Sequence, residues 1–252
     1  RGLYSRDRDQ QIMDGLLDRL GLDRVALVGT SSGGGVAFHY AATRPARVSH
    51  LVLINSGGLP RTATTDPNRA QGTAFGRWIR ARYQSEGWWR EQLEHQFAST
   101  AVPDTLVQQV YDLNRREGQR RIARATRGNF RTGDPQAVLG TITAPTLVAW
   151  GMDNVTLSHL EADVFRHWLV QAPTAIRKYE DAGHYVYLER PAEVAGDVAA
   201  FLGGRLPVRP PVAPCIGSDS ATAADATRAG SATQREAGAG LASIRNARTA
   251  GP

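Results

Sequence analysis

Four short apolar runs constrain the fold of this 252-residue chain more than any other feature of its sequence. They lie at 25–28, 51–54, 145–151 and 175–179. Segments with helical spacing of apolar residues alternate with them, at 8–22, 33–43, 160–169 and 192–202. Short apolar runs bounded by glycine or proline are typical of strands that are buried on both faces. Because strands alternate with helices, the sequence predicts an α/β fold: a parallel sheet with crossover helices.

Residues 59–140 interrupt this alternation. They are rich in Arg, Gln and Trp, contain no buried-strand pattern, and include helical stretches such as 107–116. We interpret them as a helical lid inserted between a first core part at 1–58 and a second core part at 141–204. From residue 205 to 252 the composition is dominated by Ala, Gly, Ser, Thr, Pro and Arg. Such a segment has too little apolar surface to bury, so we expect a disordered tail.

The motif Gly29-Thr30-Ser31-Ser32-Gly33 stands between a predicted strand and a predicted helix. A sharp strand-to-helix turn of this G-x-S-x-G type exposes the serine hydroxyl above the sheet. The helix N-terminus then supplies N–H groups for a developing oxyanion, here the backbone N–H of Ser32. A glycine-rich turn that contains serine by chance is the alternative. A phosphate-binding loop is excluded, because no lysine follows the glycines and G-x-G-x-x-G is absent.

A serine nucleophile needs a base within hydrogen-bond reach, and His184 is the candidate. It stands in Glu180-Asp181-Ala182-Gly183-His184-Tyr185, directly after the last predicted strand. Loops that follow the strands of a parallel sheet lie at one edge. The topology therefore predicts that His184 lies near Ser31, although a histidine on a loop is more commonly a surface residue.

Residues 1 to about 204 resemble the α/β-hydrolase fold family. The resemblance rests on five segments that follow one another in the family's order along the chain: Gly29–Gly34, Arg44–Val48, Pro145–Gly151, Gly183-His184 and Leu188–Pro191. It implies the chain order serine, acid, histidine. The acid follows the strand that ends at Gly151, which makes Asp153 the candidate that orients His184.

The chain departs from the family at this acid. Family members usually carry it three residues after the glycine, where this chain has Asn154. Either Asp153 reaches the histidine, or Asn154 orients it without a charge. In some relatives the acid follows the preceding strand, where this chain has Asn55, which is no carboxylate.

The resemblance also implies about eight strands, whereas this sequence shows the last four. The first strands and the early loop that donates a second oxyanion N–H are missing. The strand at 25–28 would then present a bare edge. We expect either that about 80 or more residues precede Arg1, or that the chain is not a competent enzyme.

Composition excludes several other classes. The net charge of +6 and the pI of about 10.0 do not indicate nucleic acid binding, because arginines alternate with acids. No run of about 18 apolar residues predicts a membrane span. Cys215 is the only cysteine, so no intramolecular disulfide forms and a reduced, cytoplasmic setting is expected. No histidine and acid cluster has the spacing of a metal site, so we expect neither metal nor cofactor.

The lid carries an aromatic set that suits an apolar acyl or ring-bearing substrate: Trp78, Trp88, Trp89, Tyr83, Phe75 and Phe97. The alternative is that these rings form the lid's own small core. The serine excludes relatives with an aspartate nucleophile, such as haloalkane dehalogenases. Three hypotheses remain: a serine hydrolase of esters or of carbon–carbon bonds in ring-cleavage products, an acyl transferase on the same fold, and a non-catalytic or degenerate fragment.

Overall fold

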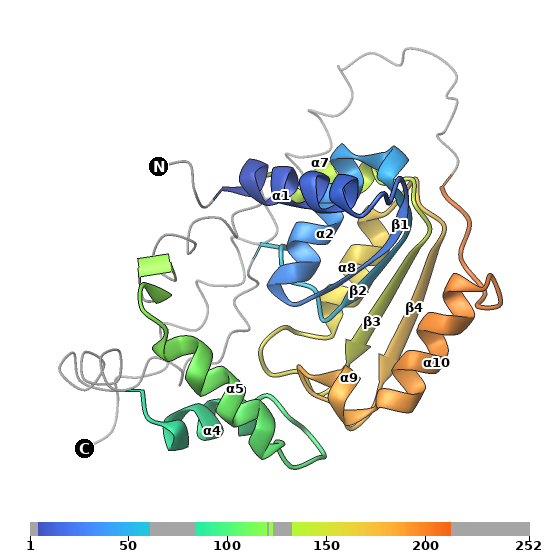
Figure 1. The fold of residues 1–252 in the computed structure, drawn as a ribbon. Coiled ribbons are helices and arrows are strands. Elements are labelled where there is room, and N and C mark those ends of the chain that lie inside the picture. The colour runs from blue at the N-terminus through green and yellow to red at the C-terminus, as the bar shows by residue number, and fades with distance from the viewer. Residues whose placement is uncertain (1–4, 61–83, 120, 123–132, 213–252) are drawn as a thin grey trace, which may run out of the picture. The chain divides into compact units, whose positions relative to one another are not determined.

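The computed structural model describes residues 5–60, 84–119, 121–122 and 133–212 (Figure 1). All of these belong to the first of two compact units, Arg1–Ala213. The expectations for Trp78, Tyr83 and Phe75, and for the tail beyond residue 212, fall outside the described residues.

One parallel sheet forms the centre of the fold, with the strand order β1-β2-β3-β4. Its strands are β1 (Val25–Thr30), β2 (Val48–Ile54), β3 (Thr146–Gly151) and β4 (Thr174–Tyr179). Each neighbouring pair is parallel. All four apolar runs are therefore strands, and the predicted α/β architecture is confirmed.

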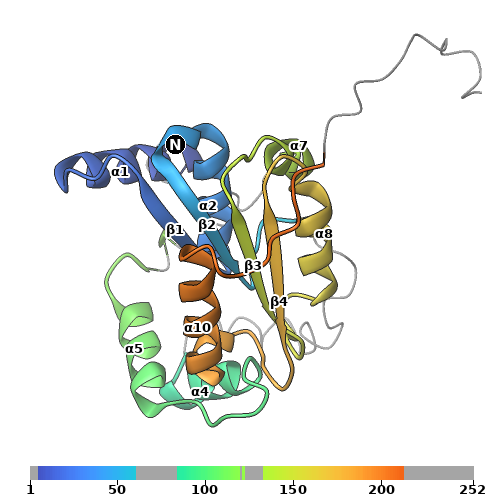
Figure 2. The same ribbon diagram turned by 90° about the vertical axis from the view of Figure 1, so that its right-hand side faces the viewer.

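Helices cover both faces of the sheet, as Figure 2 shows with α10 in front and α2 and α8 behind. The bounds of the helices that precede or follow the strands are α1 (Arg6–Arg19), α2 (Ser32–Thr43), η1 (Pro45–Arg47), α8 (Leu160–Trp168), α9 (Val186–Glu189) and α10 (Pro191–Leu202). Strand side chains alternate between two clusters because successive residues point to opposite faces. Leu53 and Trp150 pack with Phe38 and Phe165 of α2 and α8. Ile54 and Ala149 belong to the second cluster, which includes Phe201 of α10.

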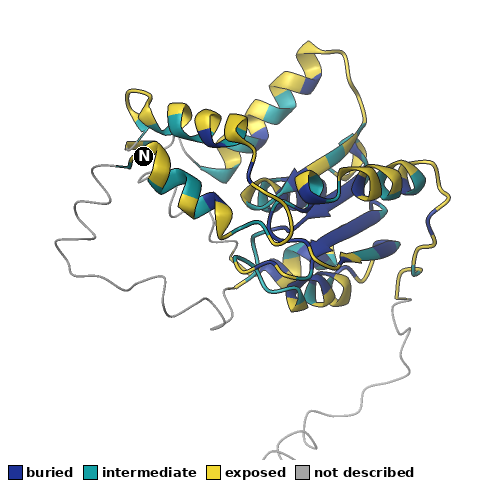
Figure 3. Ribbon diagram, turned by 90° about the horizontal axis from the view of Figure 1, so that it is seen from below, coloured by how far each residue is buried: buried dark blue, intermediate teal, exposed yellow. Residues whose placement is uncertain are grey.

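The central strands are the most deeply buried part of the described fold (Figure 3). The expectation that residues 25–28 are buried on both faces is wrong. Their exposure alternates along β1, and Val28 is 52% exposed. Among the described strands, β1 is an edge strand with β2 as its one neighbour. This position agrees with the bare edge that the resemblance implied, whereas an apolar run alone does not tell an edge strand from a central one.

The described part of the predicted lid is helical. It contains α4 (Glu86–Glu94), α5 (Asp104–Arg115) and α7 (Pro135–Gly140). The first two are joined by a small apolar cluster of Leu93, Val102 and Val107. By contrast, Leu139 of α7 lies in the main core beside the sheet, so the core begins before residue 141, where the sequence placed it.

The fold also continues past residue 204. Leu206 is buried in the second cluster. Arg209 and Thr174 exchange two backbone hydrogen bonds of 2.8 and 2.9 Å, which form an antiparallel bridge on β4. Leu206 and this bridge thus attach residues 205–212 to the core, and the predicted start of the tail is too early. None of the helices in the described ranges is long and apolar enough to cross a membrane.

Candidate active site

Ser31 occupies the turn between β1 and α2 with φ 50° and ψ −124°. A positive φ is unfavourable for a residue with a side chain and marks strained backbone. Glycine at position 29 makes the turn feasible, because a Cβ there would lie 2.6 Å from Gly33 O and 2.7 Å from the Cα of Gly34. The sharp turn that the motif predicts is confirmed.

Backbone hydrogen bonds attach this turn to the end of β2. The N–H of Ser31 donates to Ile54 O at 3.1 Å, and its carbonyl accepts from Gly57 N at 2.7 Å and Gly34 N at 3.0 Å. The Ser31 side chain does not cap α2. Ser32 is the first residue of α2, where backbone N–H groups have no partner within the helix. The hydroxyl and the predicted oxyanion donor therefore belong to one rigid bend.

Asn55 links the end of β2 to two other segments. Its side chain is fully buried, and its φ is 43°. Its Oδ1 accepts from Gly151 N at 3.0 Å, and its Nδ2 donates to Gly183 O at 3.1 Å and His184 O at 2.9 Å. The sequence analysis treated this residue only as an absent acid. A polar residue directly after a buried strand was the available signal for its role.

His184 is buried, with 6% of its surface exposed. Its backbone N–H donates to Gln96 O at 2.7 Å, and its ring meets the Tyr185 ring edge-on at 5.7 Å. The N–H of Ser31 donates a hydrogen bond to Ile54 O, and the side chain of the next residue, Asn55, donates one to His184 O. The two predicted catalytic residues thus lie at the same edge of the sheet, as the topology implied.

The two candidates for the acid position differ in burial. The Asp153 side chain is exposed, and its backbone N–H donates to Ala182 O at 3.0 Å. Asn154 is 6% exposed, and its Oδ1 accepts from Thr156 N at 2.9 Å and Leu157 N at 3.1 Å. These two donors orient the amide. Its Nδ2 is buried and has no hydrogen-bond acceptor within the described part of the chain. Of the two candidates, the asparagine is therefore the one whose side chain is buried in the fold.

The loop that carries these candidates packs directly against the histidine loop. A Cβ at Gly151 would collide with the carbonyl oxygens of Ala182 and Gly183. The backbone of each loop thus contacts the backbone of the other, with no room for a side chain between them.

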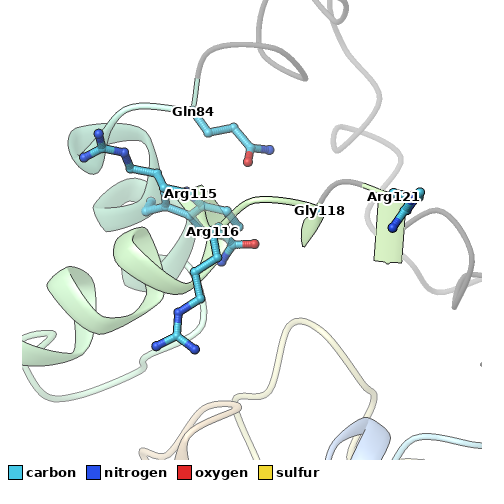
Figure 4. A pocket seen from close by; sticks show the side chains of 7 residues that line it. Gln84, Arg115, Arg116, Gly118 and Arg121 are labelled. Atoms are coloured by element: carbon cyan, nitrogen blue, oxygen red, sulfur yellow. The ribbon is translucent and has the colours of Figure 1, made fainter.

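A cavity of about 620 Å³ lies in the helical insertion (Figure 4). Its lining residues are Gln84, Trp89, Asn114, Arg115, Arg116, Gly118 and Arg121. Ser31 and His184 are not among them. Guanidinium groups make such a cavity favourable for anions. Trp88 and Trp89 of α4 contact each other edge-to-face at 4.8 Å, and only Trp89 lines the cavity.

Phe97, the remaining described member of the predicted aromatic set, packs against the cluster of Leu93, Val102 and Val107 together with Tyr185. Phe97 thus packs partly within the lid and partly against the histidine loop. Within the described ranges, no group of three or more His, Cys, Asp or Glu side chains could hold a metal ion.

The fold and this edge of the sheet are those of an α/β hydrolase. Residues 3–191 match the alpha/beta hydrolase fold family, and the chain belongs to that family. It is 28% identical over 197 residues to the 2-hydroxy-6-oxononadienedioate/2-hydroxy-6-oxononatrienedioate hydrolase of Cupriavidus pinatubonensis, which is 77% of this chain and 67% of that protein. It is 29% identical over 152 residues to the 2-hydroxy-6-oxo-6-phenylhexa-2,4-dienoate hydrolase of Comamonas testosteroni, at 58% and 52% coverage.

A similar solved structure is the meta-cleavage product hydrolase of Pseudomonas fluorescens IP01, with a TM-score of 0.65 and 18% identity. The match covers 81% of this chain and 73% of that one. At this identity the likeness shows the fold alone. The chain spans about half to two thirds of the length of the curated relatives it matches.

Proposed function

We propose that this chain is a serine hydrolase in which Ser31 attacks a carbonyl carbon and His184 accepts the hydroxyl proton. The observation that carries the proposal is that the strained Ser31 turn and His184 are held at the same strand end. The N–H of Ser31 donates to Ile54 O, and the side-chain amide of the next residue, Asn55, donates to His184 O. Nucleophile and base in hydrogen-bond reach are what a serine needs for reactivity.

The proposed reaction has two steps. The Ser31 oxygen bonds to the carbonyl carbon while the Ser32 N–H stabilises the oxyanion. The protonated imidazole of His184 then gives its proton to the leaving group, an alcohol oxygen in an ester or a carbon atom in a ring-cleavage product. Water, deprotonated by His184, then attacks the acyl-enzyme; as the acyl–oxygen bond breaks and the acid leaves, the imidazolium returns the proton to the Ser31 oxygen.

The substrate that we propose is a small carbonyl compound, either an ester or a ring-cleavage product with a carboxylate. The names of the curated relatives, which are hydrolases of such oxo acids, support this class. Product analysis with and without an alcohol acceptor separates hydrolysis from acyl transfer. The cytoplasmic setting stays a prediction.

A fluorophosphonate probe tests the nucleophile, because it forms a covalent bond with an activated serine. We expect labelling of the wild type and none of Ser31→Ala or His184→Ala. His167→Ala, which changes an exposed residue of α8, is the matched control and should label like the wild type. A folded wild type that does not label, or labelling that survives in Ser31→Ala, would contradict the proposal.

We assign the acid position to Asn154, because its side chain is buried and that of Asp153 is exposed. An amide in place of the acid of a serine triad lowers kcat by about 10⁴-fold, because it favours the wrong histidine tautomer. We expect Asn154→Asp to raise the labelling rate at least about tenfold, and Asp153→Asn to change it less than about twofold. A fall in rate in Asp153→Asn of more than about tenfold would instead assign the acid to Asp153.

A further inference from the structure

Glu189 is a buried acid that the proposed reaction does not use. It is the last residue of α9, and 6% of its surface is exposed. Its carboxylate accepts three backbone hydrogen bonds: Oε1 from Gly183 N at 2.7 Å, and Oε2 from Ala98 N at 2.7 Å and Ser99 N at 3.1 Å. Buried acids are uncommon unless they are paired or hydrogen-bonded, and these three bonds account for its burial.

The three donors come from two segments that are far apart in the sequence. Gly183 precedes the proposed base, whereas Ala98 and Ser99 follow α4 in the helical insertion. One carboxylate therefore joins the histidine loop to the insertion, with one oxygen bonded to each.

Three further contacts join the same two segments. The N–H of His184 donates to Gln96 O at 2.7 Å. The rings of Phe97 and Tyr185 stack at 5.1 Å with an interplanar angle of 19°. A Cβ at Gly183 would collide with Gln96 O, so the two backbones are in direct contact. The segment 96–99 and the loop 183–185 thus pack as one unit, and the Glu189 carboxylate is hydrogen-bonded to both.

We propose that Glu189 is the positioning residue for His184, and that it fixes the base and the insertion in one arrangement. Its effect on reactivity rests on the proposed function, whereas the joint fixation of the two segments does not. The carboxylate is required because all three partners are donors and both of its oxygens accept. A glutamine has one accepting oxygen, so its NH₂ group would face the N–H of Gly183 or those of Ala98 and Ser99.

Amide hydrogen exchange tests the fixation without a substrate. In Glu189→Gln we expect exchange at residues 98–99 and 183–184 to be at least about tenfold faster than in the wild type, while β3 and β4 keep their protection. The matched control is Glu193→Gln, which neutralises an exposed glutamate on the neighbouring helix α10. It should exchange like the wild type.

The fluorophosphonate labelling rate tests the positioning of the base. We expect Glu189→Gln to lower it about 100-fold, the effect of misplacing a reacting group by about 1 Å. Glu189→Asp keeps the charge but is one methylene shorter, so we expect partial recovery of the rate. If Glu189→Gln does not fold, both measurements are made on Glu189→Asp. We then expect faster exchange at residues 98–99 and 183–184 and a lower labelling rate than in the wild type.

The two proposals fail in different ways. A wild type that does not label ends the proposed function, while the exchange result still decides the fixation. Exchange and labelling in Glu189→Gln that match Glu193→Gln would overturn the positioning role. Loss of protection in all strands would also overturn it, because Glu189 would then stabilise the fold as a whole.

Discussion

At the scale of single residues, Ser31 stores backbone strain at the point where the proposed chemistry occurs. Its φ of 50° places it where glycine is favoured over residues with a side chain. The hydrogen bond that Ser31 donates to Ile54 O, and those that it accepts from Gly57 and Gly34, keep it there. The strain is part of how the hydroxyl is presented, since a relaxed turn would not lift the side chain from the helix start.

Replacement of Ser31 by two small residues measures this strain. Ser31→Gly and Ser31→Ala both lack the hydroxyl, but only glycine accepts the positive φ freely. We expect Ser31→Gly to be more stable than Ser31→Ala by about 1–2 kcal/mol in urea unfolding. Equal stabilities would show that the turn relaxes and that no strain is held at this position.

The sequence predicted Ser31 and Ser32 from a local motif, and the structure gives them the expected turn. The sequence did not predict that the side chains of Asn55 and Glu189 would link separate segments of the chain. Asn55 binds backbone groups of Gly151 and Gly183, and Glu189 binds that of Ala98, all of them about 90 or more residues away in the sequence. The position of Asn55 directly after a buried strand marks it as a residue of interest, but its partners, like those of Glu189 in the insertion, are brought together only in the folded chain.

At the scale of elements, the strand ends are held together by side chains as well as by the sheet. The four strands and most flanking helices followed from apolar spacing. The exposure of β1 did not follow from this spacing, because periodicity within one run says nothing of how many neighbours a strand has; the bare edge was implied only by the family resemblance. The order of Ser31 and His184 in the chain was enough to place both at one edge, since parallel strands end on the same side.

Asn55 offers a test of this linkage. Asn55→Ala removes the acceptor of Gly151 N–H and the donor to two carbonyl groups, all of them buried. We expect a loss of about 2–4 kcal/mol in the free energy of unfolding, because buried groups lose their partners. The control is Asn114→Ala, which removes one side-chain hydrogen bond to Val110 O within α5. Its free energy of unfolding should fall by less than about 1 kcal/mol. Similar losses in both variants would refute the linkage.

At the scale of the whole molecule, a buried histidine makes stability depend on pH. His39 is 4% exposed, its ring stacks on Phe38 at 4.5 Å, and Arg6 Nη1 lies 3.4 Å from its Nδ1. Burial, and secondarily the charge of Arg6, lowers the pKa of His39 to about 4. The imidazole is therefore neutral in the folded chain at neutral pH.

A lowered histidine pKa means that the unfolded chain binds a proton more readily than the folded one. The unfolded value is about 6.5, so stability should fall as the pH drops from about 6.5 toward 4, by up to about 3 kcal/mol from this residue. Chemical unfolding at pH 7 and pH 5 measures the change. His39→Gln, which has no titrating group, should show a smaller difference between the two pH values. An equal difference would assign the dependence to other groups.

The backbone contacts between loops also limit how the protein can be altered in the laboratory. Positions 29, 34, 151 and 183 admit no Cβ, because each would meet another segment at less than a normal contact distance. A library that randomises residues around the site will lose its folded members through these four glycines. The exposed side chains of α4 and α5, by contrast, can be changed while the two loops keep their backbone contacts.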